Sequence, residues 1–165
     1  MTKDNTSNSS GDLTGETLAV LNAIAGRAEY LYHIVKAMDE AGVENVDEIL
    51  KKAMYNVGQT WSKEAGDPKN PHEWWENRLS DNKRKVLKLD WVRDEENEIE
   101  LHYYRCPLCY GWERMGLEPK TIQRLCNIAH QVDYGNVESF PFELDLDPGL
   151  GKGGERCTLV VKKKK

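Results

Sequence analysis

The chain has little cysteine, and what it has is unevenly placed. The first 105 residues contain none, and the rest hold Cys106, Cys109, Cys126 and Cys157. Such a set is too small and too uneven to be the disulfide framework of a secreted domain. Residues 1–11 are polar, without the apolar core of a signal peptide, and no apolar run approaches the roughly 20 residues that cross a bilayer. We therefore expect free thiols in a cytoplasmic protein that does not span a membrane.

The chain also lacks an excess of basic residues. Its 23 Lys and Arg stand against 28 Asp and Glu, a formal charge of −5. Residues 1–80 hold 8 basic and 13 acidic groups, and residues 81–165 hold 15 of each, so neither half offers the basic face that nucleic acid requires. A length of 165 residues suits a single domain. We expect its partner to be a small-molecule substrate or ligand rather than nucleic acid or a membrane.

Apolar periodicity predicts two helices in the N-terminal part. The first covers residues 13–41, with apolar residues at three- and four-residue steps, and Gly42 ends it. Asn45 is the expected N-cap of the second, whose apolar stripe is Val46, Ile49, Leu50, Ala53, Met54, Val57 and Trp61. The two helices are expected to pair as a hairpin over residues 12–65. Tyr30, Tyr32 and Ile34 lie off the main stripe and would allow a homodimer.

The remaining chain is predicted to mix strands with helices. Residues 72–79 have no clear period and are either a short helix or a loop. Residues 87–91 and 99–103 alternate apolar with polar around a turn at residues 94–97, which predicts an antiparallel hairpin. Two helices follow, opened by Pro107 and Pro119. Residues 140–146 and 157–161 alternate again around a glycine-rich loop and predict two closing strands.

The expected fold class is therefore α+β: the N-terminal helical hairpin packed with an antiparallel sheet and two further helices. Residues 12–161 form one domain, in which residues 84–161 carry the hairpin, the two helices and the closing strands. Residues 1–11 are expected to be a disordered tail, and residues 162–165 a basic, solvated tail.

Candidate chemistry gathers in the C-terminal half. Helical spacing places Cys126, His130 and Asp133 on one stripe, so that a thiol, an imidazole and a carboxylate could face one cleft. Cys106 is expected where a strand passes into a helix, and the unpaired N–H groups there would favour its thiolate. Cys157, after the glycine-rich loop, could face the same place from the opposite side.

Two chemical interpretations are open. In the first, Cys106 attacks an electrophilic carbon, His130 moves the proton, and Asp133 orients His130 or activates water. In the second, Cys106, Cys126, His130 and Cys157 bind zinc or another transition-metal ion, either in a closed structural site or with water in place of one ligand. Such a cluster could also serve a non-catalytic sensor domain that binds a metal ion or a small molecule. The first requires hydrogen-bond reach between Cys106 and His130, and the second requires tetrahedral convergence of four ligands.

Plainer explanations compete with both. Free cysteines are often buried, so Cys126 could be core packing and Cys106 a small residue at a tight junction. The spacing of Cys106 and Cys109 matches a CxxC redox motif, but there is no second CxxC and no βαβ setting. A domain that only binds other proteins, through its acidic N-terminal helices, is a third class.

With these residues in place, the segment from Ile99 to Val161 resembles the L-2-amino-thiazoline-4-carboxylic acid hydrolase family. The matching features are a strand leading into Cys106-Pro107-Leu108, a Gly116-Leu117 pair before the next helix, Cys126 within that helix, and a glycine-rich loop followed by Cys157 in a closing strand. The ordered set is more specific than any one part, and the helical N-terminal half also looks like that of the family.

The resemblance implies hydrolytic opening of a cyclic amidine-like C–N bond in a thiazoline carboxylate. Cys106, Cys126 and Cys157 match the family's cysteines. Two features depart from the pattern. The family often has an aspartate about three residues after the helical cysteine, where this chain has Ala129, with His130 and Asp133 nearby, and Cys109 is an additional thiol.

Overall fold

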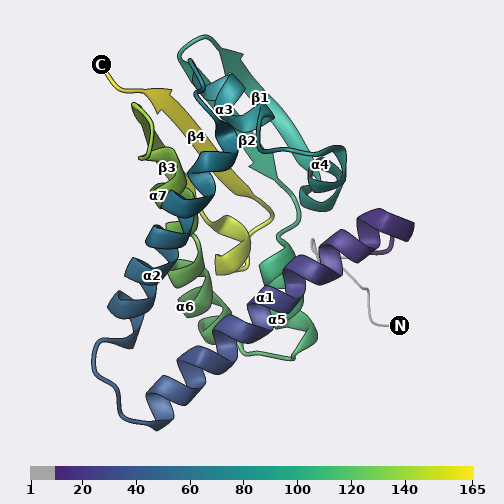
Figure 1. Ribbon diagram of the computed structural model, residues 1–165. Helices are drawn as coiled ribbons and strands as arrows, with labels where there is room; N and C mark the ends of the chain where they lie inside the picture. Colours follow the sequence, from purple (N-terminus) through teal and green to yellow (C-terminus); the bar gives the residue numbers. More distant parts are fainter. Residues whose placement is uncertain (1–9) are drawn as a thin grey trace.

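The structure, a computed structural model, describes residues 10–165 as a group of helices joined to one antiparallel sheet (Figure 1). The elements in chain order are α1 (Gly15–Glu40), α2 (Val46–Trp61), η1 (Ser62–Ala65), α3 (Pro71–Glu76), α4 (Asp81–Leu87), β1 (Leu89–Glu95), β2 (Glu98–Tyr103), α5 (Pro107–Arg114), α6 (Pro119–Ala129), α7 (Gln131–Val137), β3 (Phe142–Asp147), η2 (Gly149–Lys152) and β4 (Cys157–Lys163). The α+β class is confirmed. No helix within residues 10–165 is both long enough and apolar enough to cross a membrane.

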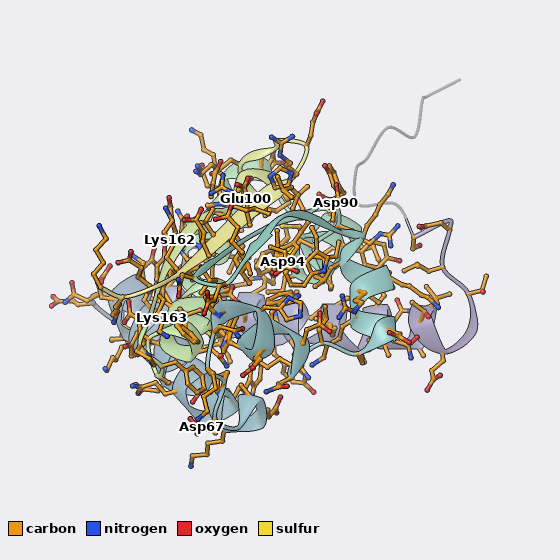
Figure 2. All side chains as sticks on the ribbon, turned by 90° about the horizontal axis from the view of Figure 1, so that it is seen from above. Asp67, Asp90, Asp94, Glu100, Lys162 and Lys163 are labelled. Atoms are coloured by element: carbon orange, nitrogen blue, oxygen red, sulfur yellow. The ribbon has the colours of Figure 1, made fainter. Side chains whose placement is uncertain are left out.

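The sheet has four strands in the order β1-β2-β4-β3, each antiparallel to its neighbour. Alternation gives it one apolar face, on which Ile99, Leu101, Leu159 and Val161 are fully buried under α3 and α7. The opposite face carries charged side chains, among them Glu100 of β2 and Lys162 of β4 (Figure 2). The predicted hairpin and closing strands are thus confirmed, and β4 runs two residues beyond the expected end of the domain.

The two N-terminal helices form as predicted but do not pack along each other. They diverge from the loop that joins them (Figure 1), and α1 lies mainly against α5 while α2 lies mainly against α7. The buried face of α1 is the predicted one, from Leu21 to Val35. On α2, Ile49 is 48% exposed instead of buried, because the helix faces α7. Asn45 occupies the N-cap position, but its side chain makes no capping hydrogen bond.

The contact between α2 and α7 depends on two glycines. A Cβ atom on Gly58 would lie 2.1 Å from the carbonyl oxygen of Val132, and one on Gly135 would lie 2.0 Å from that of Tyr55. The two backbones can therefore approach only because neither position has a side chain. Buried Asn136 fixes the crossing, since its Oδ1 accepts from Trp74 Nε1 at 2.8 Å and its Nδ2 donates to the Gly58 carbonyl at 3.3 Å. This crossing positions α7, which carries Asp133.

Several boundaries differ from the prediction. Residues 72–76 lie in helix α3, and a further short helix, α4, was not predicted, so Leu87 ends a helix instead of opening a strand. The side chain of Ser80 caps α4 by accepting a hydrogen bond from the Lys83 N–H at 3.3 Å. Ser80 is thus a sequence signal for the start of α4, but the helix is too short to show apolar periodicity. The helix opened by Pro119 ends at Ala129, and α7 begins after His130. Of the tail expected at residues 1–11, residues 1–9 lie outside the described part of the chain.

Two hydrophobic cores meet near the cysteines. The first joins α1, α2, α5 and α6 and includes Cys109, Cys126 and Cys157, and the second lies between the sheet and α3. Tyr103, the last residue of β2, packs against both cores. The chain therefore passes from sheet to helices at the point where the chemically reactive residues gather.

Candidate functional site

Cys106 lies between the sheet and the helices, as the sequence predicts. It is the residue before α5, with extended backbone at φ −116°, and Pro107 opens the helix. The pKa of the Cys106 thiol lies below its usual value, chiefly because of a hydrogen bond with the Cys109 side chain, and further because the backbone N–H groups of Cys109 and Leu108 stabilise the thiolate against desolvation. Cys106 is half-buried and so remains accessible to a small molecule.

Cys109 connects two other thiols. It is fully buried one turn into α5, and it hydrogen-bonds with both Cys106 and Cys126. These bonds raise the pKa of Cys109 far above the usual range, so its S–H remains protonated and acts as the donor. The thiol that the sequence treats as extra is therefore the centre of the group.

Cys126 is a second acidified thiol. Its pKa is lowered to about 5, first by the hydrogen bond from Cys109 and then, against desolvation, by a hydrogen bond and charge interaction with His130 and by the charge of Lys152. At neutral pH it is a thiolate held between a thiol donor and an imidazole. Hydrogen-bonding side chains thus run from Cys106 through Cys109 and Cys126 to His130, and we refer to these four residues as the thiol chain.

The glycine-rich loop covers the thiol chain closely. A Cβ atom on Gly151 would lie 2.3 Å from Cys126 Sγ, so only glycine allows η2 to approach this sulfur. Cys157 opens β4 opposite Tyr103 and is electrostatically coupled to Cys106 and Cys126. Desolvation by burial raises the pKa of Cys157 to about 12, so it remains a neutral thiol beside the chain.

A second group of polar side chains borders the thiol chain. Asp133 on α7 interacts with the charges of Arg78 and His130, and Tyr103 interacts with those of Asp133 and Cys106. Desolvation is the largest cause in each case: it raises the pKa of Asp133 and Tyr103 and lowers that of Arg78. All three side chains nevertheless keep some accessible surface. Desolvated titratable groups that gather beside an acidified thiol are typical of functional sites.

The site residues predicted from the sequence interact pairwise. Cys126 interacts with Cys106, His130 and Asp133, although His130 lies between two helices instead of within one. His130 interacts with Cys126, and its path to Cys106 runs through the thiols between them. Cys157 lies beside them, as the zinc alternative requires. Within residues 10–165, however, no three His, Cys, Asp or Glu side chains are arranged to hold a metal ion, so the geometry lends that alternative no support.

Sequence reasoning missed three residues of this region. Arg78 follows α3 in a segment without periodicity, and nothing in its surroundings in the sequence distinguishes it. Tyr103 could have been found, because it ends the strand that leads to Cys106 and stands only three residues before it. Lys152, in the glycine-rich loop, interacts electrostatically with Cys126 and is paired with Asp147 at 2.8 Å.

Two surface hollows lie elsewhere. One of about 880 Å³ is lined by residues 95–98 of the β1–β2 turn and by the lysines that end β4, including Lys162 and Lys163 (Figure 2). The other, of about 530 Å³, lies between residues 12–17 and the end of α4. Their linings contain carboxylates and cationic groups but neither thiol nor imidazole. We therefore place the candidate site at the thiol chain, where acidified thiols, an imidazole and a desolvated carboxyl interact.

The chain was compared with known proteins. A model of the L-2-amino-thiazoline-4-carboxylic acid hydrolase family matches residues 24–161. The match includes both cores, the thiol chain and the side chains around it. None of the curated proteins matches the chain significantly.

Proposed function

Because the chain belongs to the L-2-amino-thiazoline-4-carboxylic acid hydrolase family, we propose that it hydrolyses a C–N bond in a 2-amino-thiazoline-4-carboxylate, with Cys106 as nucleophile. The observation that carries this proposal is the thiol chain, which links an accessible, acidified thiol to an imidazole through two intervening sulfurs. A nucleophile connected to a proton-transfer group is the arrangement that covalent hydrolysis needs.

Cys106 is preferred to Cys126 as nucleophile because of access. Both thiols have a lowered pKa, but Cys126 is only 9% exposed and Gly151 covers its sulfur. Cys106 keeps more accessible surface and has backbone N–H groups beside it, which can also stabilise charge that develops on a bound substrate. Cys126 instead holds the negative charge that orients His130.

In the proposed reaction the Cys106 thiolate adds to the amidine carbon of the ring in its imino tautomer, and the π electrons of the exocyclic C=N bond move to the exocyclic nitrogen. Return of that electron pair breaks the ring C–N bond, and the departing ring nitrogen takes a proton from His130. The ring is then open, and the former amidine carbon is bound to the enzyme sulfur. Water adds to that carbon after losing a proton to Asp133, whose desolvated carboxyl has a raised pKa suited to a general base. Expulsion of the Cys106 thiolate releases a cysteine that carries a carbamoyl group, so one water is consumed per ring.

The test is turnover of 2-amino-thiazoline-4-carboxylate by the purified full chain, followed by loss of the ring. We expect Cys106→Ser to reduce the rate by at least about 1,000-fold, since an unactivated hydroxyl replaces a thiolate. Mass spectrometry of the wild-type chain during turnover should detect an adduct on Cys106. Turnover of the Cys106→Ser variant at the wild-type rate would exclude Cys106 as nucleophile.

A matched pair of histidine variants tests the proton-transfer role. His130→Gln should lower the rate by about 100-fold or more, the usual contribution of a general acid or base. His72→Gln is the control, because His72 lies at the protein surface and pairs with Asp94 at 2.8 Å, away from the thiols. Equal losses in the two variants would show that His130 has no special role.

A further inference from the structure

Arg78 carries a largely desolvated positive charge. It interacts electrostatically with Asp133 and Glu64, but neither forms an ion pair with it among the described residues. Its Nε and Nη1 atoms are shielded from solvent and have no hydrogen-bond partner, and no ion pair of Arg78 occurs among the described residues. Unpartnered buried donors cost about 1–3 kcal/mol each when the donor is neutral and more when it is charged, so proteins seldom retain them without a purpose. An anion that arrives from outside would remove this cost.

The guanidinium of Arg78 is held in place. It lies over the ring of Trp74, 4.8 Å from the centroid, and that ring is in turn fixed by the hydrogen bond from its Nε1 to Asn136. A planar, pre-oriented guanidinium is well suited to carboxylate recognition, because its N–H groups match the two oxygens and little entropy is lost on binding.

A second unsatisfied donor lies in the same region. Trp75 Nε1 is also buried without a partner, and the Trp75 ring stacks on Tyr103 with centroids 5.8 Å apart and planes at 22°. Tyr103 interacts electrostatically with both Arg78 and Cys106. The unsatisfied donors of Trp75 and Arg78 are therefore connected through Tyr103 to the accessible thiol.

Asp133 does not act as the hydrogen-bonded counter-ion of Arg78. It interacts with Arg78 through charge, but among residues 10–165 no hydrogen bond or ion pair joins the two side chains. The carboxyl thus leaves the Nε and Nη1 donors of the guanidinium available to the carboxylate of a ligand.

We propose that Arg78, assisted by Trp75 Nε1, forms the subsite that binds the carboxylate of a small ring substrate and so directs the ring toward Cys106. The assignment rests on the proposed function for the identity of the substrate, but the subsite itself requires only a planar ring acid. Arg78 would then determine specificity: a ring compound with a carboxylate should bind more tightly than the same ring without one.

The test uses thiazole-4-carboxylate and thiazole, a matched pair of ring compounds with and without the carboxylate that lack the cleavable amidine. Calorimetric titration of the full chain should detect binding of the acid and much weaker binding of thiazole. In Arg78→Gln we expect the dissociation constant of the acid to rise about 100-fold, as for the loss of one partner of a buried charged pair, with that of thiazole unchanged. In Arg78→Lys, which keeps the charge without the fork, the rise should be about tenfold.

Arg27→Gln is the control variant. Arg27 also lies over an indole ring, that of Trp61 at 5.3 Å, but it is exposed and contributes to none of the thiol pKa shifts, so this variant should bind the acid as the wild type does. The Lys variant keeps the test valid if the Gln variant does not fold. An unchanged dissociation constant in Arg78→Lys and Arg78→Gln, an equal loss in Arg27→Gln, or no binding of the acid by the wild type would overturn the subsite.

The same titrations separate this inference from the proposed function. If Arg78-dependent binding of the acid is found but thiazoline carboxylates are not hydrolysed, the subsite stands and the reaction is wrong. If hydrolysis occurs and kcat/KM is the same in wild type and Arg78→Gln, the reaction stands and the subsite is wrong.

Discussion

The ionisation of Cys126 provides a test of the thiol chain that needs no substrate. With a pKa of about 5, Cys126 should be about 99% thiolate at pH 7, whereas an ordinary cysteine would be only a few per cent ionised. Cys157, with a pKa of about 12, should contribute almost nothing to the thiolate population at this pH. The native protein should therefore show ultraviolet thiolate absorbance at neutral pH.

The measurement is an absorbance titration of the native chain from about pH 8 down to about pH 4. We expect a loss of thiolate absorbance centred near pH 5, and this step should be absent from Cys126→Ser and retained in Cys157→Ser. Removing the imidazole in His130→Gln should move the step to higher pH, because one of the groups that stabilise the thiolate is gone.

The same ionisation predicts how stability depends on pH. Folding lowers the pKa of Cys126, so its contribution to stability is complete above the unfolded pKa, near 9, and is lost as pH falls toward 5. Between pH 7 and pH 5 this amounts to about 2–3 kcal/mol, at about 1.4 kcal/mol per pH unit. The difference in free energy of unfolding between wild type and Cys126→Ser, from urea denaturation, should shrink by that amount. A difference independent of pH, or thiolate absorbance that appears only above about pH 8, would refute the thiol chain.

Three further predictions concern packing and access. Gly135→Ala should destabilise the chain by about 2 kcal/mol in urea denaturation, because the new methyl group would meet a backbone carbonyl of α2 at 2.0 Å. The control, Gly26→Ala, lies in open space on α1 and should stabilise the chain by about 0.5–1 kcal/mol. Equal effects of the two substitutions would contradict the close crossing of α2 and α7. Gly151→Ala should lose about 1–3 kcal/mol and shift the absorbance step of Cys126, since its methyl group would displace that sulfur; a variant with wild-type stability and titration would show that the loop does not contact the thiol. Limited alkylation at neutral pH, mapped by mass spectrometry, should modify Cys106 first, and initial modification of Cys126 would reverse the order of access.

Local patterns in the sequence were enough to predict most of the elements. The buried face of α1 follows helical periodicity, and the alternating residues of β2 and β4 give the sheet its apolar face. Cys106 could be placed at the start of a helix because Pro107 follows it directly. Each of these features depends on residues within a few positions of one another, so the sequence alone carries the signal.

Packing between distant segments decided the rest. The divergence of α1 and α2 depends on the glycine crossing of α2 with α7, where Gly58 meets a segment more than 70 residues away. The bridging role of Cys109 depends on where α6 places Cys126, and the burial of Arg78 depends on Trp74 and on neighbours from α7. The order of residues determined which reactive groups the protein has and on which elements they lie. Only the tertiary structure decided their surroundings, because desolvation and unmet hydrogen bonds depend on what the whole chain packs around a group.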